Sequence, residues 1–335
     1  MNAKPRIVVL GSNFAGMTTA RFLAKELKGK AEITVIDKKS YLLFVPNIPE
    51  TVMKNRNPQI DMHLQCLPFY EDDKTNFIQA RVTAIDPETK TVEYTPDVRP
   101  GSPSEKISYD YLVIALGCRL AYDDIEGFAE YGSTVSDCFY GNRLRRYLFE
   151  GGYKGGPIVI GSARFHQGTT DRPDWLKTLS AACEGPVMEM SMLLGTYLKS
   201  HLHHKDMSGI TMFTPGDVLG EDAGAALAGE FATLAKSYGM KFIYNTQNVK
   251  RITAEGVEFV SGEQAEGEIK IVFPDWKTHK FLQDMPFSDD MGFIVTDKTM
   301  RNPRYPEIFA VGDCAAITVP KLGAIGDAEA RVCVR

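Results

Sequence analysis

The N-terminal segment constrains the fold most, because it joins a short apolar run, a glycine turn and a helical pattern. The stretch RIVVLGSNFAGMTTARFLAKEL (6–27) reads as strand, turn and helix, and EITVIDKKSYLLF (32–44) follows as a second strand. This order is the βαβ unit of a dinucleotide-binding fold, in which the turn meets a pyrophosphate at the helix N-terminus. A buried strand turn that holds no ligand is the alternative for this segment taken alone.

The turn runs from Gly11 to Gly16 and departs from the usual three-glycine pattern. Gly11 suits the tight turn and Gly16 lets the helix pack closely on the strand, but Asn13 replaces the middle glycine. Asparagine tolerates positive φ better than most residues, so we expect the turn to survive with a looser approach to the pyrophosphate. Asp37 lies 26 residues beyond Gly11, where an acidic side chain accepts a hydrogen bond from a ribose hydroxyl.

Two later segments complete the pattern of a flavoprotein with two dinucleotide-binding domains. YDYLVIALG (109–117) reads as a buried strand ending in a small-residue turn, and RNPRYPEIFAVGDCAA (301–316) as a strand ending in Gly312 and Asp313. In such flavoproteins the first segment closes the first part of the FAD domain. The second returns the chain to it, and its aspartate meets the ribityl chain. The order of the three segments therefore predicts FAD.

A second Rossmann-like unit is predicted between them. GPIVIGSARF (156–165) repeats the pattern of the N-terminal strand and turn, but the loop 161–166 lacks the further glycines that a nucleotide site needs. The next strand ends in Thr214, where an acidic residue is expected, and Asp217 is the nearest candidate. We therefore expect this unit to lack a working NAD site.

The predicted fold class is α/β with two Rossmann-like dinucleotide-binding domains of the FAD/NAD(P)-binding type. Residues 1–120 form the first part of the FAD-binding domain, and residues 121–280 form the second Rossmann-like domain. Residues 281–335 return to the FAD-binding domain, with an end that we expect to be truncated and to lack a C-terminal membrane-anchoring region.

Cys183 stands just before Gly185-Pro186, which opens an apolar helical run. Proline suits the first turn of a helix, so Cys183 is placed near a helix N-terminus, where free N–H groups and the helix dipole favour a thiolate. The alternative is a small buried apolar residue.

Bulk properties exclude several classes of protein. The net charge of −5 gives no general nucleic-acid-binding character, and no apolar run reaches the roughly 20 residues that span a bilayer. The first strand begins almost at residue 1, so no signal peptide is expected. The cysteines lack metal-binding spacing, and the His201–His204 cluster is interpreted as a solvated helix end, so no metal site is predicted.

With these residues in hand, the chain resembles the sulfide:quinone oxidoreductases, a family related to flavocytochrome c sulfide dehydrogenase and type II NADH dehydrogenase. The marks are YLLFVPNIPE, PIVIGSA followed by CEGPVMEM, and GDCAAITVPKLG. The resemblance implies FAD-dependent oxidation of sulfide to polysulfide or sulfur through a cysteine persulfide, with electrons passed to quinone. It also implies a peripheral (monotopic) position on the cytoplasmic side of the membrane; a homo-oligomer is left open.

The resemblance also assigns the cysteines. The essential family cysteine maps onto Cys183. A second maps onto Cys138, or onto Ser136 if the alignment shifts by two, and in several members this cysteine bonds covalently to the flavin; the alternative is a free thiol. A third lies beyond the VPK segment, and Cys333 comes too early for it. Either the chain is truncated or its redox partner differs. We interpret the remaining cysteines as packing residues: Cys66, Cys118 and Cys314.

Lys321 resembles the family lysine beside the flavin, with a surface lysine as the alternative. Glu184, Glu189 and His166 are candidates for proton transfer near Cys183. The full set of predicted FAD contacts is Gly11, Asn13, Ala15, Gly16, Asp37, Lys38, Val82, Ala115, Gly117, Gly312, Asp313 and Lys321.

Two other functions remain open at this point. A type II NADH:quinone dehydrogenase would need a working second nucleotide loop and has no use for Cys183. A non-catalytic FAD-binding redox protein fits the missing third cysteine.

Overall fold

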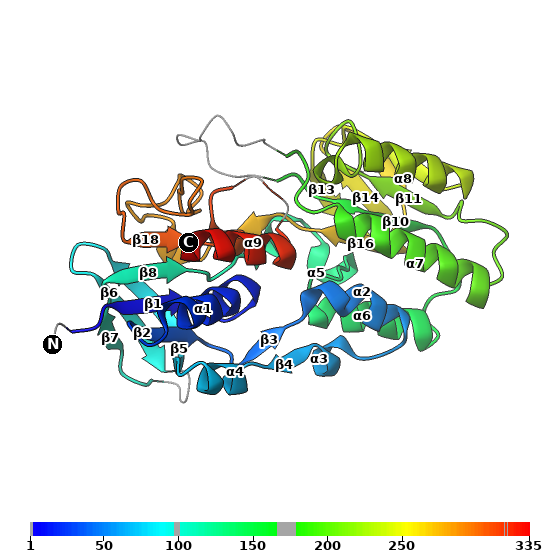
Figure 1. Ribbon diagram of the computed structural model, residues 1–335. Helices are drawn as coiled ribbons and strands as arrows, with labels where there is room; N and C mark the ends of the chain where they lie inside the picture. Colours follow the sequence, from blue (N-terminus) through cyan, green and yellow to red (C-terminus); the bar gives the residue numbers. More distant parts are fainter. Residues whose placement is uncertain (1–2, 97–100, 166–178, 318, 320) are drawn as a thin grey trace.

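The computed structural model describes residues 3–96, 101–165, 179–317, 319 and 321–335 of the chain. Two α/β lobes lie side by side, each built on a parallel sheet, and the chain passes from the first lobe to the second and back (Figure 1). The predicted α/β fold with two Rossmann-like units is therefore confirmed.

Within the described residues, the first sheet has seven strands in the order β18-β8-β1-β2-β5-β6-β7. The strands from β18 to β5 run parallel, and β5, β6 and β7 form an antiparallel extension. The bounds are β1 (Arg6–Leu10), β2 (Glu32–Asp37), β5 (Asn76–Asp86), β6 (Thr91–Pro96), β7 (Glu105–Ser108), β8 (Tyr111–Ile114) and β18 (Ile308–Ala310).

The second lobe carries a parallel sheet in the order β12-β11-β10-β16 and a small antiparallel sheet of β13, β14 and β15. Its strands are β10 (Ile158–Ser162), β11 (Ile210–Phe213), β12 (Lys241–Ile243), β13 (Val249–Ile252), β14 (Gly256–Phe259), β15 (Gln264–Glu266) and β16 (Ile269–Phe273). Two short pairs complete the strands: β3 (Tyr41–Leu43) with β4 (His63–Gln65), and β9 (Arg119–Leu120) with β17 (Trp276–Lys277).

The helices pack against the sheets and against one another. Those of the first segment are α1 (Phe14–Leu27), α2 (Ile48–Met53), α3 (Pro58–Asp61) and α4 (Leu67–Asp72). Those of the second lobe and the return are α5 (Phe128–Tyr131), α6 (Cys138–Phe149), α7 (Gly185–His201), α8 (Ala225–Ser237) and α9 (Gly323–Val334). None of the helices in the described ranges combines the length and the apolar character that crossing a bilayer requires.

Local sequence explains the limits of the main elements. Every residue of β10 is buried, as expected for a parallel strand that is covered on both faces. Helix α1 ends where Lys28 adopts a left-handed conformation and its N–H donates to the Ala24 carbonyl. Asp137 begins α6 by accepting hydrogen bonds from the N–H groups of Phe139 and Tyr140 at 2.8 and 3.0 Å.

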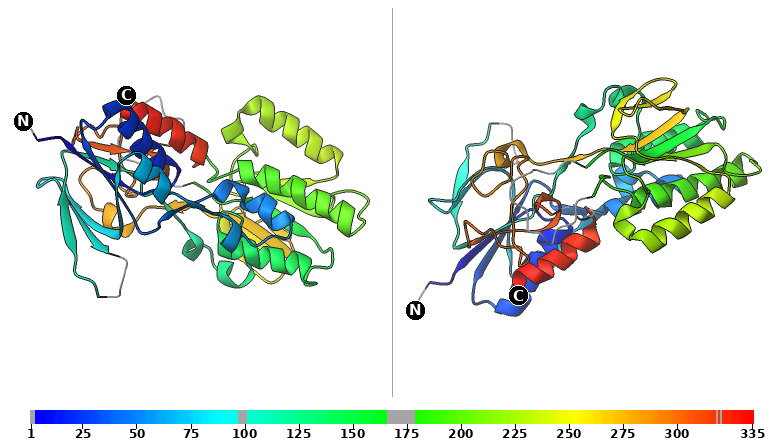
Figure 2. Two further views of the ribbon diagram at one scale, coloured as in Figure 1. Left: turned by 60° about the horizontal axis from the view of Figure 1, so that its bottom comes forward. Right: turned by 90° about the horizontal axis from the view of Figure 1, so that it is seen from above.

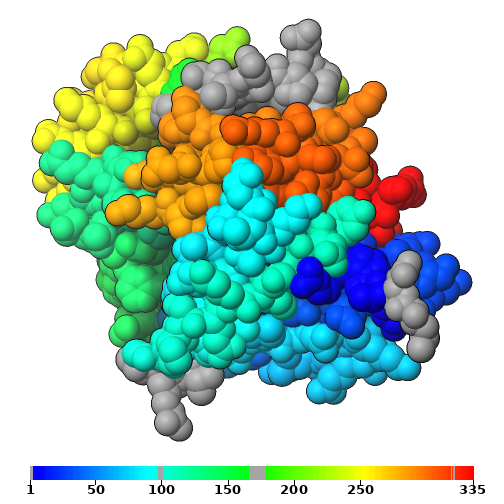
Figure 3. All heavy atoms as spheres, turned by 90° about the vertical axis from the view of Figure 1, so that its left-hand side faces the viewer, coloured from blue at the N-terminus to red at the C-terminus, as the bar shows by residue number. Residues whose placement is uncertain are grey.

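Helices α1 and α9 lie side by side although they come from opposite ends of the chain (Figures 1 and 2). Gly326 of α9 allows this close approach, because a Cβ at its position would lie 3.2 Å from the Ala15 Cβ. The long segment between β17 and β18 forms a continuous layer above the cyan strands in Figure 3. The last part of the chain is thus an integral part of the first lobe.

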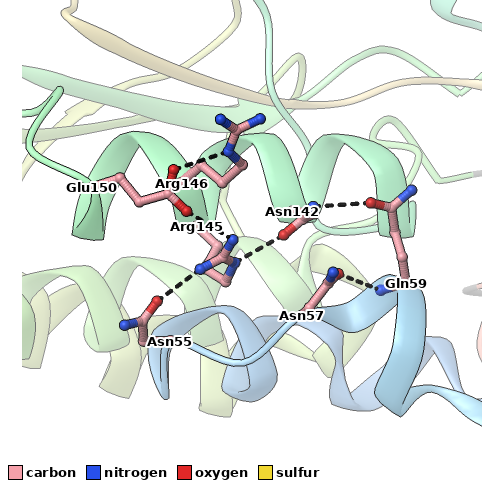
Figure 4. A network of polar contacts seen from close by, with 7 residues as sticks. All are labelled: Asn55, Asn57, Gln59, Asn142, Arg145, Arg146 and Glu150. Carbon is pink, nitrogen blue, oxygen red and sulfur yellow. Dashed lines mark hydrogen bonds and ion pairs between the residues drawn. The ribbon is translucent and has the colours of Figure 1, made fainter.

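One part of the first segment crosses to the second lobe. Ile48 and Val52 of α2 join the buried core formed with α6 and α7. A polar network on the surface reinforces this contact (Figure 4). Arg145 of α6 donates to the side chains of Asn55, Asn142 and Glu150, and Asn142 donates to Gln59 at 2.9 Å. The lobes are therefore joined by packing as well as by the connecting strands.

Candidate functional site

A cavity of about 1070 Å³ opens at the carboxyl ends of the parallel strands of the first lobe and reaches the second lobe. Its wall is formed by residues that are far apart in the sequence: the β1–α1 turn, the ends of β2 and β8, the 312–313 turn and the start of α7. Ligands of open α/β sheets bind at this edge. The volume lies at the upper end of the range for cofactor sites, which leaves room for an extended cofactor and a small substrate.

The structure brings nearly all predicted FAD contacts into this wall. The lining includes Gly11, Asn13, Ala15, Asp37, Lys38, Val82, Ala115, Gly117, Gly312, Asp313 and Lys321. Gly16 lies behind the turn instead of in the lining, and a Cβ there would stand 2.0 Å from the Gly11 carbonyl oxygen. Its role is to let α1 pack on the turn, which is the role that the sequence assigned to it.

Three features of the wall fit FAD. Gly11 and Gly312 adopt positive φ, so the backbone forms a cradle without side chains. Asn13 directly precedes α1 and its side chain makes no capping hydrogen bond, so the free N–H groups at the helix N-terminus are open to a phosphate. Asp37 accepts hydrogen bonds from the N–H groups of Ser12 at 2.7 Å and Lys39 at 2.8 Å, which fixes its carboxylate at the end of β2.

Cys183 lines the same cavity from the side of the second lobe. Its backbone N–H donates to Ser162 Oγ at 2.9 Å, so the end of β10 positions it just before α7. Only 5% of the residue is exposed. Burial raises the pKa of the Cys183 thiol, and the carboxylates of Asp222, Asp313 and Glu184 raise it further. The expectation that the helix N-terminus lowers this pKa is therefore wrong, because burial and nearby negative charges outweigh the helix dipole.

The structure does not bring Cys138 into the lining. Cys138 begins α6 and packs against the core of the second lobe, and burial raises its pKa to about 11. Val135 and Ser136 line the cavity instead. The alternative alignment, which gives Ser136 the family's cysteine position, matches this placement.

Lys321 is 8% exposed, so the surface alternative does not hold. Its Nζ donates to the carbonyl oxygens of Ala315 at 3.0 Å and Ile317 at 3.1 Å, and it lies 5.2 Å from the centre of the Phe293 ring. No carboxylate of the described residues forms an ion pair with it. Lys321 thus places a cation in the cavity wall that forms no direct ion pair but acts on the nearby carboxyl groups of Asp313 and Glu329, whose pKa values it lowers.

The three proton-transfer candidates differ in position. Glu189 lines the cavity, and burial raises the pKa of its carboxyl group. Glu184 is almost fully buried behind Cys183 and outside the lining. His166 lies outside the described residues.

Sequence reasoning missed several residues of the wall. Cys118 was interpreted as packing, but it lines the cavity, and its Sγ donates to the Asp313 carbonyl oxygen at 3.0 Å. Its position directly after Gly117 at the end of β8 was the signal. Trp276 and His279 follow β16 and line the cavity from the return segment, where no sequence pattern marked them. Cys66 and Cys314 are fully buried, as expected for packing residues.

The close packing of β10 on β11 in the second sheet explains why residue 161 is a glycine. A Cβ at Gly161 would lie 2.3 Å from the Phe213 carbonyl oxygen, so the glycine serves the close approach of β10 and β11. Beyond it, the N–H of Phe165 donates to the Ser180 carbonyl oxygen at 2.9 Å, and Arg164 pairs with Ala181. These contacts join the end of β10 to the segment that leads into α7. The described residues hold no group of three or more side chains suited to a metal ion.

Comparison with known proteins agrees with this geometry. Residues 5–162 match the family described as pyridine nucleotide-disulphide oxidoreductase. The sulfide-quinone reductase of Aquifex aeolicus is 24% identical over 332 residues, which cover 93% of this chain and 68% of that protein. The type II NADH:quinone oxidoreductase of Staphylococcus haemolyticus is 30% identical over 146 residues, which cover 43% of this chain and 34% of that protein.

The X-ray structure of the sulfide:quinone oxidoreductase from Aquifex aeolicus has a TM-score of 0.80 to this chain at 24% identity. The match covers 98% of this chain and 75% of that one. The resemblance to sulfide:quinone oxidoreductases that the sequence indicated is confirmed.

Proposed function

We propose that this chain, which resembles the sulfide:quinone oxidoreductases over almost its whole length, is a flavoprotein that oxidises sulfide with FAD and Cys183 and passes the electrons to quinone. The observation that carries the proposal is the shared cavity: Cys183 and the predicted FAD contacts line one wall although they come from separate parts of the chain.

Bound FAD would supply the acceptor for two electrons. Asn13 and the α1 N-terminus would hold its pyrophosphate, Asp37 its adenosine ribose and Asp313 its ribityl chain. Lys321 would stabilise negative charge on the reduced ring system, since it lines the cavity and forms no direct ion pair among the described residues. These residues would place the acceptor beside Cys183, which lines the same cavity.

Cys183 would bind the sulfur. The Cys183 thiol and HS⁻ would join through one S–S bond to give a persulfide anion, with the release of two protons and two electrons. Bound FAD would accept the two electrons, and Glu189, whose carboxyl group lines the cavity wall, would be able to take one of the protons. Transfer of the bound sulfur to further sulfide would extend it to polysulfide. The reduced flavin would then pass the two electrons to quinone.

The decisive experiment is an anaerobic titration of the FAD-loaded protein with sulfide, followed by flavin absorbance. We expect the flavin band to bleach in the natural protein and to persist in Cys183→Ser, with FAD still bound. Cys118→Ser, which changes another cysteine of the same wall, is the matched control and should keep sulfide-dependent bleaching. Rapid bleaching by sulfide in Cys183→Ser would refute the role of this thiol.

The same titration tests the main alternative. The match to a type II NADH:quinone oxidoreductase supports NADH as a possible donor, whereas the loop 161–166, which lacks the further glycines of a nucleotide site, opposes it. Bleaching by NADH and not by sulfide would favour the dehydrogenase. Full FAD occupancy without turnover on any quinone would favour a non-catalytic redox protein.

Because the proposed electron acceptor is quinone, the proposal includes a peripheral position of the protein on the cytoplasmic side of the membrane. Flotation with vesicles made of bacterial-type lipids would test this attachment. A covalent bond between FAD and Cys138 stays a prediction, which acid precipitation tests directly: the yellow colour would remain with the protein. The placement of Ser136 in the wall supports non-covalent FAD.

A further inference from the structure

A buried chain of hydrogen bonds lies directly behind the cofactor wall. Ser12 belongs to the β1–α1 turn, Cys66 precedes α4, and Tyr70 lies in α4. All three are at most 1% exposed, and none of them lines the cavity, although Gly11 and Asn13 on either side of Ser12 do. The segment that leads into α4 therefore packs against the back of the proposed FAD site.

Each side chain of this chain of hydrogen bonds carries one proton that it is able to donate. The Sγ of Cys66 donates to the Ser40 carbonyl oxygen at 3.0 Å, and the Ser12 Oγ lies 3.7 Å from the same sulfur. The Tyr70 hydroxyl and the Ser12 Oγ are 2.7 Å apart. Because Cys66 uses its proton for Ser40, the order that satisfies every group has Tyr70 donating to Ser12 and Ser12 donating to Cys66.

Ser12 connects this chain of hydrogen bonds to Asp37, the candidate for binding the adenosine ribose. The backbone N–H of Ser12 donates to the Asp37 Oδ2 at 2.7 Å, while its side chain bonds to Tyr70. Ser40, at the other end, follows Asp37 by three residues. The contacts therefore hold the glycine turn and the segment after β2 together, and Asp37 lies between these two anchors.

The ring of Tyr70 has a support of its own. It stacks on Phe77 in β5, with the ring centres 5.5 Å apart and the ring planes at 10°. Strand β5 is the parallel neighbour of β2, with Phe77 opposite Val35. Removal of the hydroxyl alone therefore leaves the ring packed and takes away the hydrogen bond to Ser12.

We propose that Tyr70 is a positioning residue for FAD, which fixes the Asp37 carboxylate through Ser12 and thereby sets how strongly the site prefers a ligand with free hydroxyls on its adenosine ribose. A carboxylate that is already held in place loses no further freedom when the ribose binds, so its hydrogen bond counts fully toward affinity. This inference rests on the proposed function only for the binding of FAD, and its test needs neither sulfide nor quinone.

The test compares the binding of FAD with that of an analogue that lacks both hydroxyls of the adenosine ribose. Each ligand is titrated into protein freed of FAD, and flavin fluorescence gives the two dissociation constants. Tyr70→Phe removes the hydroxyl and keeps the ring. Tyr109→Phe is the matched control, because Tyr109 is equally buried in the same core and its hydroxyl has no hydrogen-bond partner within the described residues.

We expect Tyr70→Phe to weaken FAD binding roughly fivefold to tenfold, about the effect of one lost buried hydrogen bond, and to lower the preference for FAD over the analogue by a similar factor. Tyr109→Phe should change neither quantity. Unchanged FAD affinity in Tyr70→Phe, an equal loss for both ligands, or no preference for FAD in the natural protein would overturn the proposal. An equal loss would mean that the hydroxyl only stabilises the lobe as a whole.

Ser12→Ala removes the same hydrogen bond from the other side, and it decides the question by the same criteria if Tyr70→Phe does not fold. The double variant should bind FAD as the weaker-binding single variant does, because both substitutions remove one shared interaction. Additive losses would overturn the proposal.

Sulfide-dependent bleaching at saturating FAD is recorded on the same proteins to separate this inference from the proposed function. A lowered preference for FAD without bleaching would overturn the sulfide function and leave the role of Tyr70 intact. Bleaching with an unchanged preference would do the reverse.

Discussion

Gly11 offers the sharpest test of how the cofactor site is built. Its φ of +101° lies in the left-handed region, and its N–H donates to the Ile36 carbonyl oxygen at 2.8 Å. A Cβ at this position would stand 2.2 Å from the Ala115 carbonyl oxygen and 2.7 Å from the Ala115 carbonyl carbon. Both atoms are backbone, so Gly11→Ala forces the ends of β1 and β8 apart.

The expected cost has two parts. The left-handed conformation costs an alanine about 1–2 kcal/mol. The contact with Ala115 adds about 1–3 kcal/mol, the usual cost of overpacking a site whose neighbours are unable to move away. The sum of about 2–5 kcal/mol is a large share of the 5–15 kcal/mol by which a typical domain is stable. Separation of the strand ends should also widen the cradle, and about 1.4 kcal/mol of lost binding energy weakens FAD affinity tenfold.

Gly29→Ala is the matched control. Gly29 has a φ of +77°, but no atom lies within 4 Å of an added Cβ. Both substitutions carry the conformational cost, so the difference between them isolates the contact with Ala115. Urea unfolding with and without excess FAD, together with FAD titration, measures the two effects. Equal loss of stability in the two variants, or unchanged FAD affinity in Gly11→Ala, would refute the account of the cradle.

Two further predictions concern stability. Burial raises the pKa of Glu329 to about 7 from 4.5, so the folded state binds more protons than the unfolded state in this window. The free energy of unfolding should therefore fall by roughly 3 kcal/mol as the pH rises from about 4.5 to about 7. In Glu329→Gln, the free energy measured by urea unfolding should depend less on pH. An equally steep dependence in the variant would contradict this prediction. Arg145→Ala should cost about 1–3 kcal/mol, because Arg145 is mostly buried and bonds to three side chains, whereas Arg146→Ala, which removes an exposed ion pair, should cost less than about 1 kcal/mol. Chemical denaturation of the two variants checks this order, and equal losses would show that the network in Figure 4 adds nothing.

The sequence was enough to predict the position of residues whose role depends on a local pattern. The predicted turn at Gly11, the acidic end of β2 at Asp37 and the turn at Gly312 all lie in the wall of one cavity. Each lies at or just beyond the carboxyl end of a parallel strand, and the carboxyl ends of parallel strands meet at one edge of the sheet. The order of these segments in the chain then predicted the two-lobed fold.

Other features depend on contacts that no local pattern records. The choice between Ser136 and Cys138 depends on which turn of the chain faces the cavity at the start of α6, and the sequence left an uncertainty of two residues there. The crossing of α2 to the second lobe was not predicted either. Its apolar residues mark it as buried, but they do not say against which lobe.

The sequence by itself determined the two Rossmann-like units, the cradle for a dinucleotide and the placement of Cys183 before a helix. It suggested a lowered pKa for this thiol, because a helix N-terminus is a local feature and stabilises negative charge. Only the tertiary structure decided the opposite, since burial and the carboxylates of Asp222 and Asp313 come from segments distant in the chain. Electrostatic energy depends on separation in space and on access to water, and folding alone fixes both.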